Sequence, residues 1–178
     1  MGRVGKKTSV VGPLVQGRVK EDRMSRIEEK IKEMGLVLPA PRWPDVPNFV
    51  PWRIAGDLVF IAGHVPFRAD GTIITGKLGD TMAIEEGYQA ARLVALSLMG
   101  TLKGAIGDLD RVSQFLKLHC MVNSTPDFPD HPRVANGASD FIIEVFGERG
   151  RHTRAAIGMA NLPGGACIEI EMQVQVQG

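Results

Sequence analysis

The sequence predicts an α+β fold in which two helices cover one face of a mixed sheet of about six strands. Two observations predict the sheet: apolar and polar residues alternate almost without error in 166–176, and the alternation returns in 112–122. One further observation predicts the helical layer, since apolar residues recur at helical spacing in 80–107 and 132–147. Helices grouped on one side would leave the other sheet face uncovered, which favours burial against further subunits.

Length and composition describe one globular domain. The chain has 178 residues, of which 44% are hydrophobic and 23% charged. Residues 1–23 hold six Lys/Arg and two Asp/Glu, so the rest of the +1 chain sums to −3 and no nucleic-acid partner is expected. No apolar run approaches the roughly 20 residues of a membrane span. Cys120 and Cys167, both on predicted strands, suit a reduced, cytoplasmic setting, and no Cys/His spacing predicts a metal site.

The N-terminal region is predicted in two parts. Residues 1–23 are expected to be a flexible basic arm. Residues 24–47 are expected to form a short amphipathic helix, capped by Ser25, and a proline-rich lead-in that Trp43 attaches to the body. The main domain is then 48–178.

The main domain should begin with β structure. An edge strand is expected at 48–54 and a buried strand at 57–62, followed by a turn at Asp70-Gly71. The long helix should start after an N-cap at Asp80 or Thr81 and end at Gly107.

A long strand and a further helix should follow. In the strand 112–122 we expect these side chains to point inward: Val112, Leu116, Leu118, Cys120 and Val122. Pro132 suits the start of the next helix and Gly147 its end.

The stretch 153–176 is predicted to be a hairpin around 161–165. The uncovered sheet face would then carry Arg154, Gly158, His119, Glu169 and Glu171. Small residues around the arginine leave room for a planar carboxylate, so it is a candidate anion receptor. The other interpretation is a structural ion pair with one of the two glutamates.

Two motifs carry a resemblance to a known family. The pattern R-x-x-x-G-x-A-x-L-P-x-G-A-x-I-E-I-E, from Arg154 to Glu171, resembles the C-terminal signature of the RidA (YjgF-like) family, also called L-PSP endoribonucleases. The segment Gly56–Pro66 is similar to the family pattern G-(D/N)-L-(I/V)-F-x-S-G-Q-x-P. The similarity covers about 48–176, and a leading helix with a proline-rich lead-in is similar to a longer subgroup.

The resemblance implies a chorismate-mutase-like fold and a homotrimer with three clefts between subunits. It implies hydrolytic deamination of enamine or imine intermediates, such as 2-aminoacrylate, to 2-oxo acids and ammonia, without a metal or organic cofactor. Such an enzyme is a hydrolase acting on C–N bonds, and its ligand is a small 2-imino or 2-oxo acid.

The resemblance also assigns roles to residues of this chain. Arg154 matches the arginine that binds the substrate carboxylate, and Glu169 matches the glutamate associated with the attacking water. Gly63 matches a glycine whose backbone lines the cleft. Asn136 matches a helix asparagine, with a structural role.

Three positions depart from the family pattern. Phe49 stands at the position of a tyrosine, so a hydroxyl beside the substrate is missing. His64 stands in place of a glutamine; it is either a pocket residue that titrates near neutral pH or a hydrogen-bonded turn histidine. Ala156 replaces a common cysteine. Two other functions therefore stay open: a non-catalytic or regulatory protein that binds small carboxylates, and an endoribonuclease or translation inhibitor.

Overall fold

The computed structural model describes residues 25–42 and 48–177, so the predicted arm 1–23 and Trp43 lie outside it. The described part has three α-helices beside one five-stranded sheet, which confirms the α+β class. The helices are α1 (Arg26–Glu33), α2 (Ile84–Ile106) and α3 (His131–Phe146). The strands are β1 (Trp52–Ala55), β2 (Leu58–His64), β3 (Val112–Asn123), β4 (Thr153–Met159) and β5 (Ile168–Val176).

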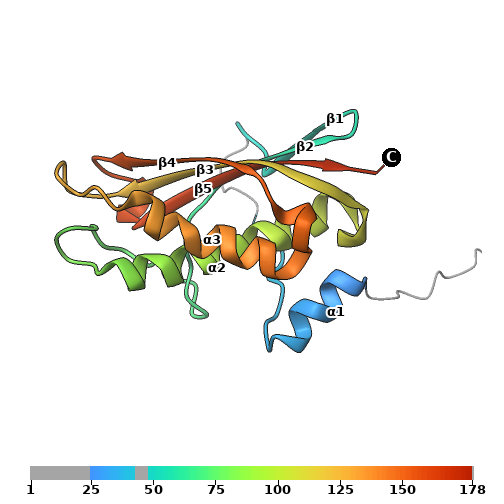
Figure 1. The fold of residues 1–178 in the computed structure, drawn as a ribbon, viewed down its shortest axis with the longest axis horizontal. Coiled ribbons are helices and arrows are strands. Elements are labelled where there is room, and N and C mark those ends of the chain that lie inside the picture. The colour runs from blue at the N-terminus through green and yellow to red at the C-terminus, as the bar shows by residue number, and fades with distance from the viewer. Residues whose placement is uncertain (1–24, 43–47, 178) are drawn as a thin grey trace, which may run out of the picture.

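The sheet has the strand order β1-β2-β5-β3-β4, with β3 and β4 parallel and all other neighbours antiparallel. Figure 1 shows α2 and α3 together on one face of this sheet, as predicted, and α1 at the outer side of the helical layer. The predicted sixth strand is absent from the described residues, because the extended pieces at Phe67 and Thr75 form only isolated bridges. No helix in the described ranges is long and apolar enough to cross a membrane.

The predicted C-terminal hairpin is wrong. The strands β4 and β5 both pair with β3, which lies between them. Their connection contains a short 3-10 turn, η3 (Pro163–Gly165), and passes the end of β3. There the Asn123 side-chain amide donates to the carbonyl of Ala166 at 3.1 Å. The residues of this turn therefore connect two strands that are not neighbours in the sheet. The local sequence does not distinguish such a connection from a hairpin.

The inward pattern of β3 also differs at one position. Its register against β5 shifts between Phe115 and Lys117, which marks a bulge. As a result Phe115 is buried, while the predicted Leu116 is half-exposed. The other predicted inward residues of β3 are buried.

The start of α2 lies later than predicted. Its N-cap is Ala83, whose backbone N–H donates to the Glu86 carboxylate at 2.8 Å. Thr81 instead accepts a hydrogen bond from the backbone of Lys77 in the preceding turn. The predicted end is confirmed, since Gly107 caps the helix with a φ of 80°.

The helices α2 and α3 approach each other closely at Gly137. A Cβ atom at this position would lie 2.0 Å from the backbone oxygen of Tyr88 on α2. The two backbones can therefore pack together only because position 137 has no side chain.

We expect Gly137→Ala to lower the free energy of unfolding by about 3 kcal/mol, at the upper end of the range for overpacking, because a backbone carbonyl cannot rotate away. Urea denaturation measures the loss. The control is Gly35→Ala, where φ is 74° but no atom lies within 4 Å of the new Cβ, so only backbone strain of about 1 kcal/mol applies. Equal losses in the two variants would contradict close packing at Gly137.

Candidate functional site

A cavity of about 570 Å³ opens at the end of β2, and four of the predicted site residues line it: Phe49, Gly63, His64 and Glu169. The rest of its wall comes from several elements, with Arg42 from the lead-in, Phe67 from the loop after β2, Ser97 from α2 and Pro163 from η3. These four residues thus converge with others from segments far apart in the sequence.

Glu169 lies directly against the backbone of Gly63. A Cβ atom at position 63 would fall 2.0 Å from Glu169 Oε1, so only glycine admits the carboxylate here. The pairing of β2 with β5 shifts between Ile61 and His64, which brings this part of β2 out of regular register. Burial, and secondly the negative charge of Glu171, raise the pKa of Glu169. A carboxyl group with a raised pKa suits the orientation of water and the relay of protons.

His64 is held by hydrogen bonds at both ring nitrogens. Nδ1 donates to the Ala62 carbonyl at 2.8 Å, which leaves Nε2 to accept from the Thr101 hydroxyl, also at 2.8 Å. Burial lowers the pKa of His64, so the neutral ring is favoured. The ring therefore ties β2 to α2 while it forms part of the cavity wall.

Phe49 supplies an apolar wall. This residue is 53% exposed, and its side chain carries no group that could donate a proton or a hydrogen bond. The hydroxyl that the family tyrosine would provide therefore has no substitute at this position.

Arg154 lies on the opposite face of the sheet from Glu169. It stands beside Leu118 in the register of β3, and Leu118 is fully buried beneath the helices. Its Nη1 donates to Asn136 Oδ1 at 3.0 Å and to Ser139 Oγ at 2.9 Å, both on α3. The prediction that Arg154 belongs to the uncovered face is therefore wrong, and Ser139 is a contact that sequence reasoning missed.

Gly158 is also misplaced by the prediction. It lies on the helix side of β4, where a Cβ atom would meet His131 Nε2 at 2.5 Å and Ser124 Oγ at 2.8 Å. Those two atoms are joined by a hydrogen bond of 2.9 Å. They line a second cavity of about 500 Å³ at the end of β4, on the same side as Arg154.

The two charged residues assigned to the chemistry thus belong to two different surfaces of one chain. The strand β5 turns Ile168 and Ile170 into the core, so Glu169 between them faces away from the helices. The guanidinium of Arg154 is held against α3 on the helix side. The alternative of a structural Arg154–Glu169 pair within one chain is therefore excluded.

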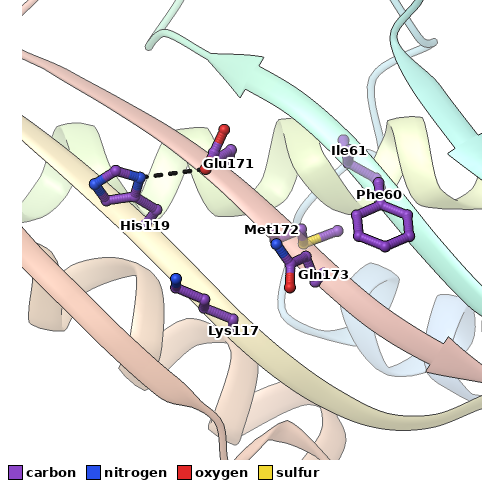
Figure 2. A pocket seen from close by; sticks show the side chains of 7 residues that line it. All are labelled: Phe60, Ile61, Lys117, His119, Glu171, Met172 and Gln173. Atoms are coloured by element: carbon purple, nitrogen blue, oxygen red, sulfur yellow. Dashed lines mark hydrogen bonds and ion pairs between the residues drawn. The ribbon is translucent and has the colours of Figure 1, made fainter.

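The uncovered sheet face carries its own mixed cluster. A hollow of about 80 Å³ opens on this face. Figure 2 shows His119 pointing toward Glu171 beside Lys117, and His119 Nδ1 lies 3.2 Å from Glu171 Oε1. Apolar side chains stand open around it, with Phe60 41% and Ile157 42% exposed. An exposed apolar area between charged groups is typical of a surface that another chain covers.

The cysteines do not suit nucleophilic chemistry. Burial raises the pKa of Cys120 to about 12 and that of Cys167 to about 11, so both stay protonated thiols at neutral pH. Across residues 25–42 and 48–177, no three His, Cys, Asp or Glu side chains gather as a metal ion would require.

Comparison with known proteins adds a family and several relatives. The family model described as "YjgF/chorismate mutase-like, putative endoribonuclease" matches residues 28–170, and so begins within α1, ahead of residue 48. Protein TCP17 of Trypanosoma cruzi is 41% identical over 152 residues, covering 85% of this chain and 94% of its own.

Two solved structures are similar in fold and sequence. Atu1372, a protein of unknown function from Agrobacterium tumefaciens, is 38% identical with a TM-score of 0.78, over 85% of this chain and 94% of its own. A "putative endoribonuclease" from Shewanella oneidensis MR-1 is 30% identical with a TM-score of 0.79, over 84% of this chain and 99% of its own.

We expect Glu169→Gln to change how stability depends on pH. Because the pKa of Glu169 is raised in the folded chain, the folded state holds this proton to higher pH than the unfolded state does. Wild-type stability therefore falls as pH rises from the ordinary glutamate value of 4.5 through the raised value, and the glutamine variant lacks this fall. Urea midpoints from pH 4 to 8 should show the variant more stable at neutral pH, with the gap closing near pH 4.

The control is Glu33→Gln, an exposed position at the end of α1. This variant should follow the wild-type curve at every pH. A Glu169→Gln curve parallel to wild type would show that burial does not raise the pKa of this carboxyl group.

We expect Gly63→Ala to push the Glu169 carboxylate away from β2 without unfolding the chain, because the clash is with the end of a flexible side chain. The displaced carboxylate regains water, so the pKa of Glu169 should fall toward 4.5. Carboxyl ¹³C NMR titration measures it. An unchanged pKa in the folded variant would contradict the close approach of the two residues.

Proposed function

This chain belongs to the YjgF-like (RidA) family, and on that basis we propose that it hydrolyses reactive enamine and imine intermediates to 2-oxo acids and ammonia. The substrate class is a small acid resembling 2-aminoacrylate. The reaction takes place in clefts between identical subunits.

One observation carries this proposal: a half-buried carboxyl group with a raised pKa, Glu169, lies against Gly63 in the wall of a cavity. The enamine first takes a proton on carbon and loses one from nitrogen, which gives the imine. Water then adds across the C=N bond, the carbon–nitrogen bond breaks, and ammonia leaves the 2-oxo acid. Glu169 accepts a proton from the water and returns one to the departing nitrogen.

The carboxylate anchor must come from a second copy of the chain. Arg154 and Glu169 face opposite sides of one sheet, so they can meet over a single ligand only if two chains contribute one each. Arg154 lies on the edge strand β4, where a neighbouring chain can reach it. Its planar guanidinium suits a carboxylate that is bound through two oxygens.

The uncovered sheet face supports the same assembly. Its exposed Phe60 and Ile157 and its hydrogen bond between His119 and Glu171 would be covered in a closed ring. We place the homotrimer here as part of the proposal, with three clefts formed at the edges of neighbouring sheets.

A second function is a non-catalytic protein that binds small carboxylates. Phe49 favours it, because the cavity lacks the hydroxyl that a family tyrosine would supply. The endoribonuclease named for the family and for the Shewanella relative is a third possibility, and RNA cleavage by the wild-type protein, lost in Glu169→Gln, would support it in place of the deaminase.

We expect Arg154→Ala to lower kcat/KM by roughly 10- to 100-fold, since a charge-assisted contact of about 1.5–3 kcal/mol is lost, and Glu169→Gln to lower turnover as well. An amino-acid oxidase generates the imine in the assay, and semicarbazide traps what remains. Mixing the two variants, refolded together, should restore activity in about one cleft in four, because such clefts combine an intact arginine with an intact glutamate from different chains.

The control for the mixture is Arg154→Ala mixed with the double variant, which leaves every cleft without an intact arginine. No recovery in the first mixture would contradict a shared cleft. Turnover that is unchanged in Glu169→Gln would contradict the role of this carboxyl group, and binding of 2-oxo acids without turnover in wild type would favour the non-catalytic function.

A further inference from the structure

The cavity that holds Glu169 already contains a cation from the same chain. Arg42 lines it together with Gly63 and Glu169, although Arg42 belongs to the lead-in before the main domain. Its position raises the question of what this guanidinium binds.

Two glycines of α2 bring the lead-in to this place. A Cβ atom at Gly100 would lie 2.0 Å from the backbone oxygen of Pro39, and one at Gly104 would lie 2.4 Å from Pro41 Cγ. A glycine inside a helix costs about 1 kcal/mol relative to alanine. Here the missing side chains, four residues apart on one helix face, form a groove in which the segment before Arg42 lies.

The guanidinium is held from a second direction. Arg42 Cζ lies 3.8 Å from the centre of the Phe67 ring, which is the distance of a cation–π contact. Phe67 is itself fixed, since its backbone bridges to Ile73 across the turn after β2. A guanidinium that lies over an aromatic ring keeps N–H donors for a carboxylate, which matches the planar fork of arginine.

Arg42 does not serve to neutralise Glu169. The pKa of Glu169 is raised by burial and by the charge of Glu171, whereas a guanidinium in contact would lower it. His64 is favoured in its neutral form and both of its nitrogens are occupied. Neither Glu169 nor His64 therefore neutralises Arg42, so its guanidinium can bind an anion.

We infer that Arg42 determines specificity in this cavity and that it binds the distal carboxylate of a dicarboxylic ligand, the 2-imino or 2-oxo acid of an acidic amino acid. The inference rests on the proposed function, in which Arg154 of a second chain binds the carboxylate next to the reacting carbon. The guanidinium groups of Arg42 and of Arg154 from a second chain would then bind the two carboxylates of one ligand. A cavity of about 570 Å³ has room for such a chain beside the contribution of a second subunit.

The test compares two ligands of five carbons that differ only at the far end: the imines of glutamate and of norvaline, formed in the assay by amino-acid oxidases. Wild type should prefer the dicarboxylate. Arg42→Gln should lower kcat/KM for the glutamate imine by at least about 10-fold, the loss of one charge-assisted contact, and leave the norvaline imine within about twofold. The matched control, Arg26→Gln, removes an arginine of α1 whose side chain is 88% exposed and pairs with Asp110, and should change neither value.

A second variant keeps the arginine and moves the segment that holds it. Gly100→Ala should push Pro39 away from α2 and so lower selectivity for the dicarboxylate in the same direction as Arg42→Gln. The folded state of this variant is checked by its circular dichroism spectrum and its unfolding midpoint.

A binding measurement separates the two proposals. Calorimetry with 2-oxoglutarate and 2-oxopentanoate reports the same preference without any turnover. An Arg42-dependent preference for 2-oxoglutarate would support the inference even if no imine is hydrolysed, a result that would overturn only the proposed reaction. Equal binding of both ligands by wild type, or equal loss of both in Arg42→Gln, would overturn the role of Arg42 while leaving the deaminase in place.

Discussion

The pairing of both β4 and β5 with β3 governs the rest of this molecule. Because β3 lies between them, the side-chain direction at each position of the two outer strands is fixed against the same buried row of β3. Arg154 pairs with the buried Leu118 of β3 and therefore points toward α3. Glu169 on β5 pairs with Met121 of β3, which is not in the buried row, and therefore points away from the helices. One chain alone therefore cannot bring Arg154 and Glu169 to the same ligand, so any reaction that needs both requires two chains.

Three glycines, which have no side chain, allow the close contacts that position the cavity. Position 63 admits the Glu169 carboxylate, position 137 admits the backbone of α2 against α3, and position 100 admits the lead-in. In each case a carbonyl or carboxylate oxygen would lie 2.0 Å from a Cβ atom. These contacts connect the helical layer to the cavity: the helix that carries Gly100 also holds the ring of His64 through Thr101. The packing of α2 on the sheet therefore helps to set the position of this part of the cavity wall.

The parts of the fold that could be predicted from sequence have strong periodicity of their own. The strict alternation of β5 and the helical spacing in α2 and α3 gave the correct elements and faces. The predictions failed where the local structure depends on residues that are distant in the sequence. The turn at 161–165 has the residues of a hairpin, yet Asn123 binds this connection and keeps β3 in between. The bulge at Phe115 likewise exists only against β5.

The same reasoning explains which site residues could be found. Family motifs identified Gly63 and Glu169. The contact between these two residues is set by β2 and β5, which pair directly with each other. Arg42 lies in a segment with no periodicity, and its neighbours in space are α2 and Phe67, so no local signal marks it. Ser139 stands on a helix whose span is predicted well, but its partner Arg154 was assigned to the wrong side of the sheet.

Assembly as proposed would also change the state of Glu169. In the single chain its pKa is raised, because burial removes water and Glu171 adds a like charge. A guanidinium from a second chain would lower that pKa and leave the empty cleft with an ionised carboxylate. An acidic ligand that binds the same guanidinium cancels much of this effect and adds its own negative charge, so the pKa rises again as the ligand binds. Glu169 would then take up a proton, from the attacking water, at the moment when the nitrogen of the substrate must receive one to leave as ammonia.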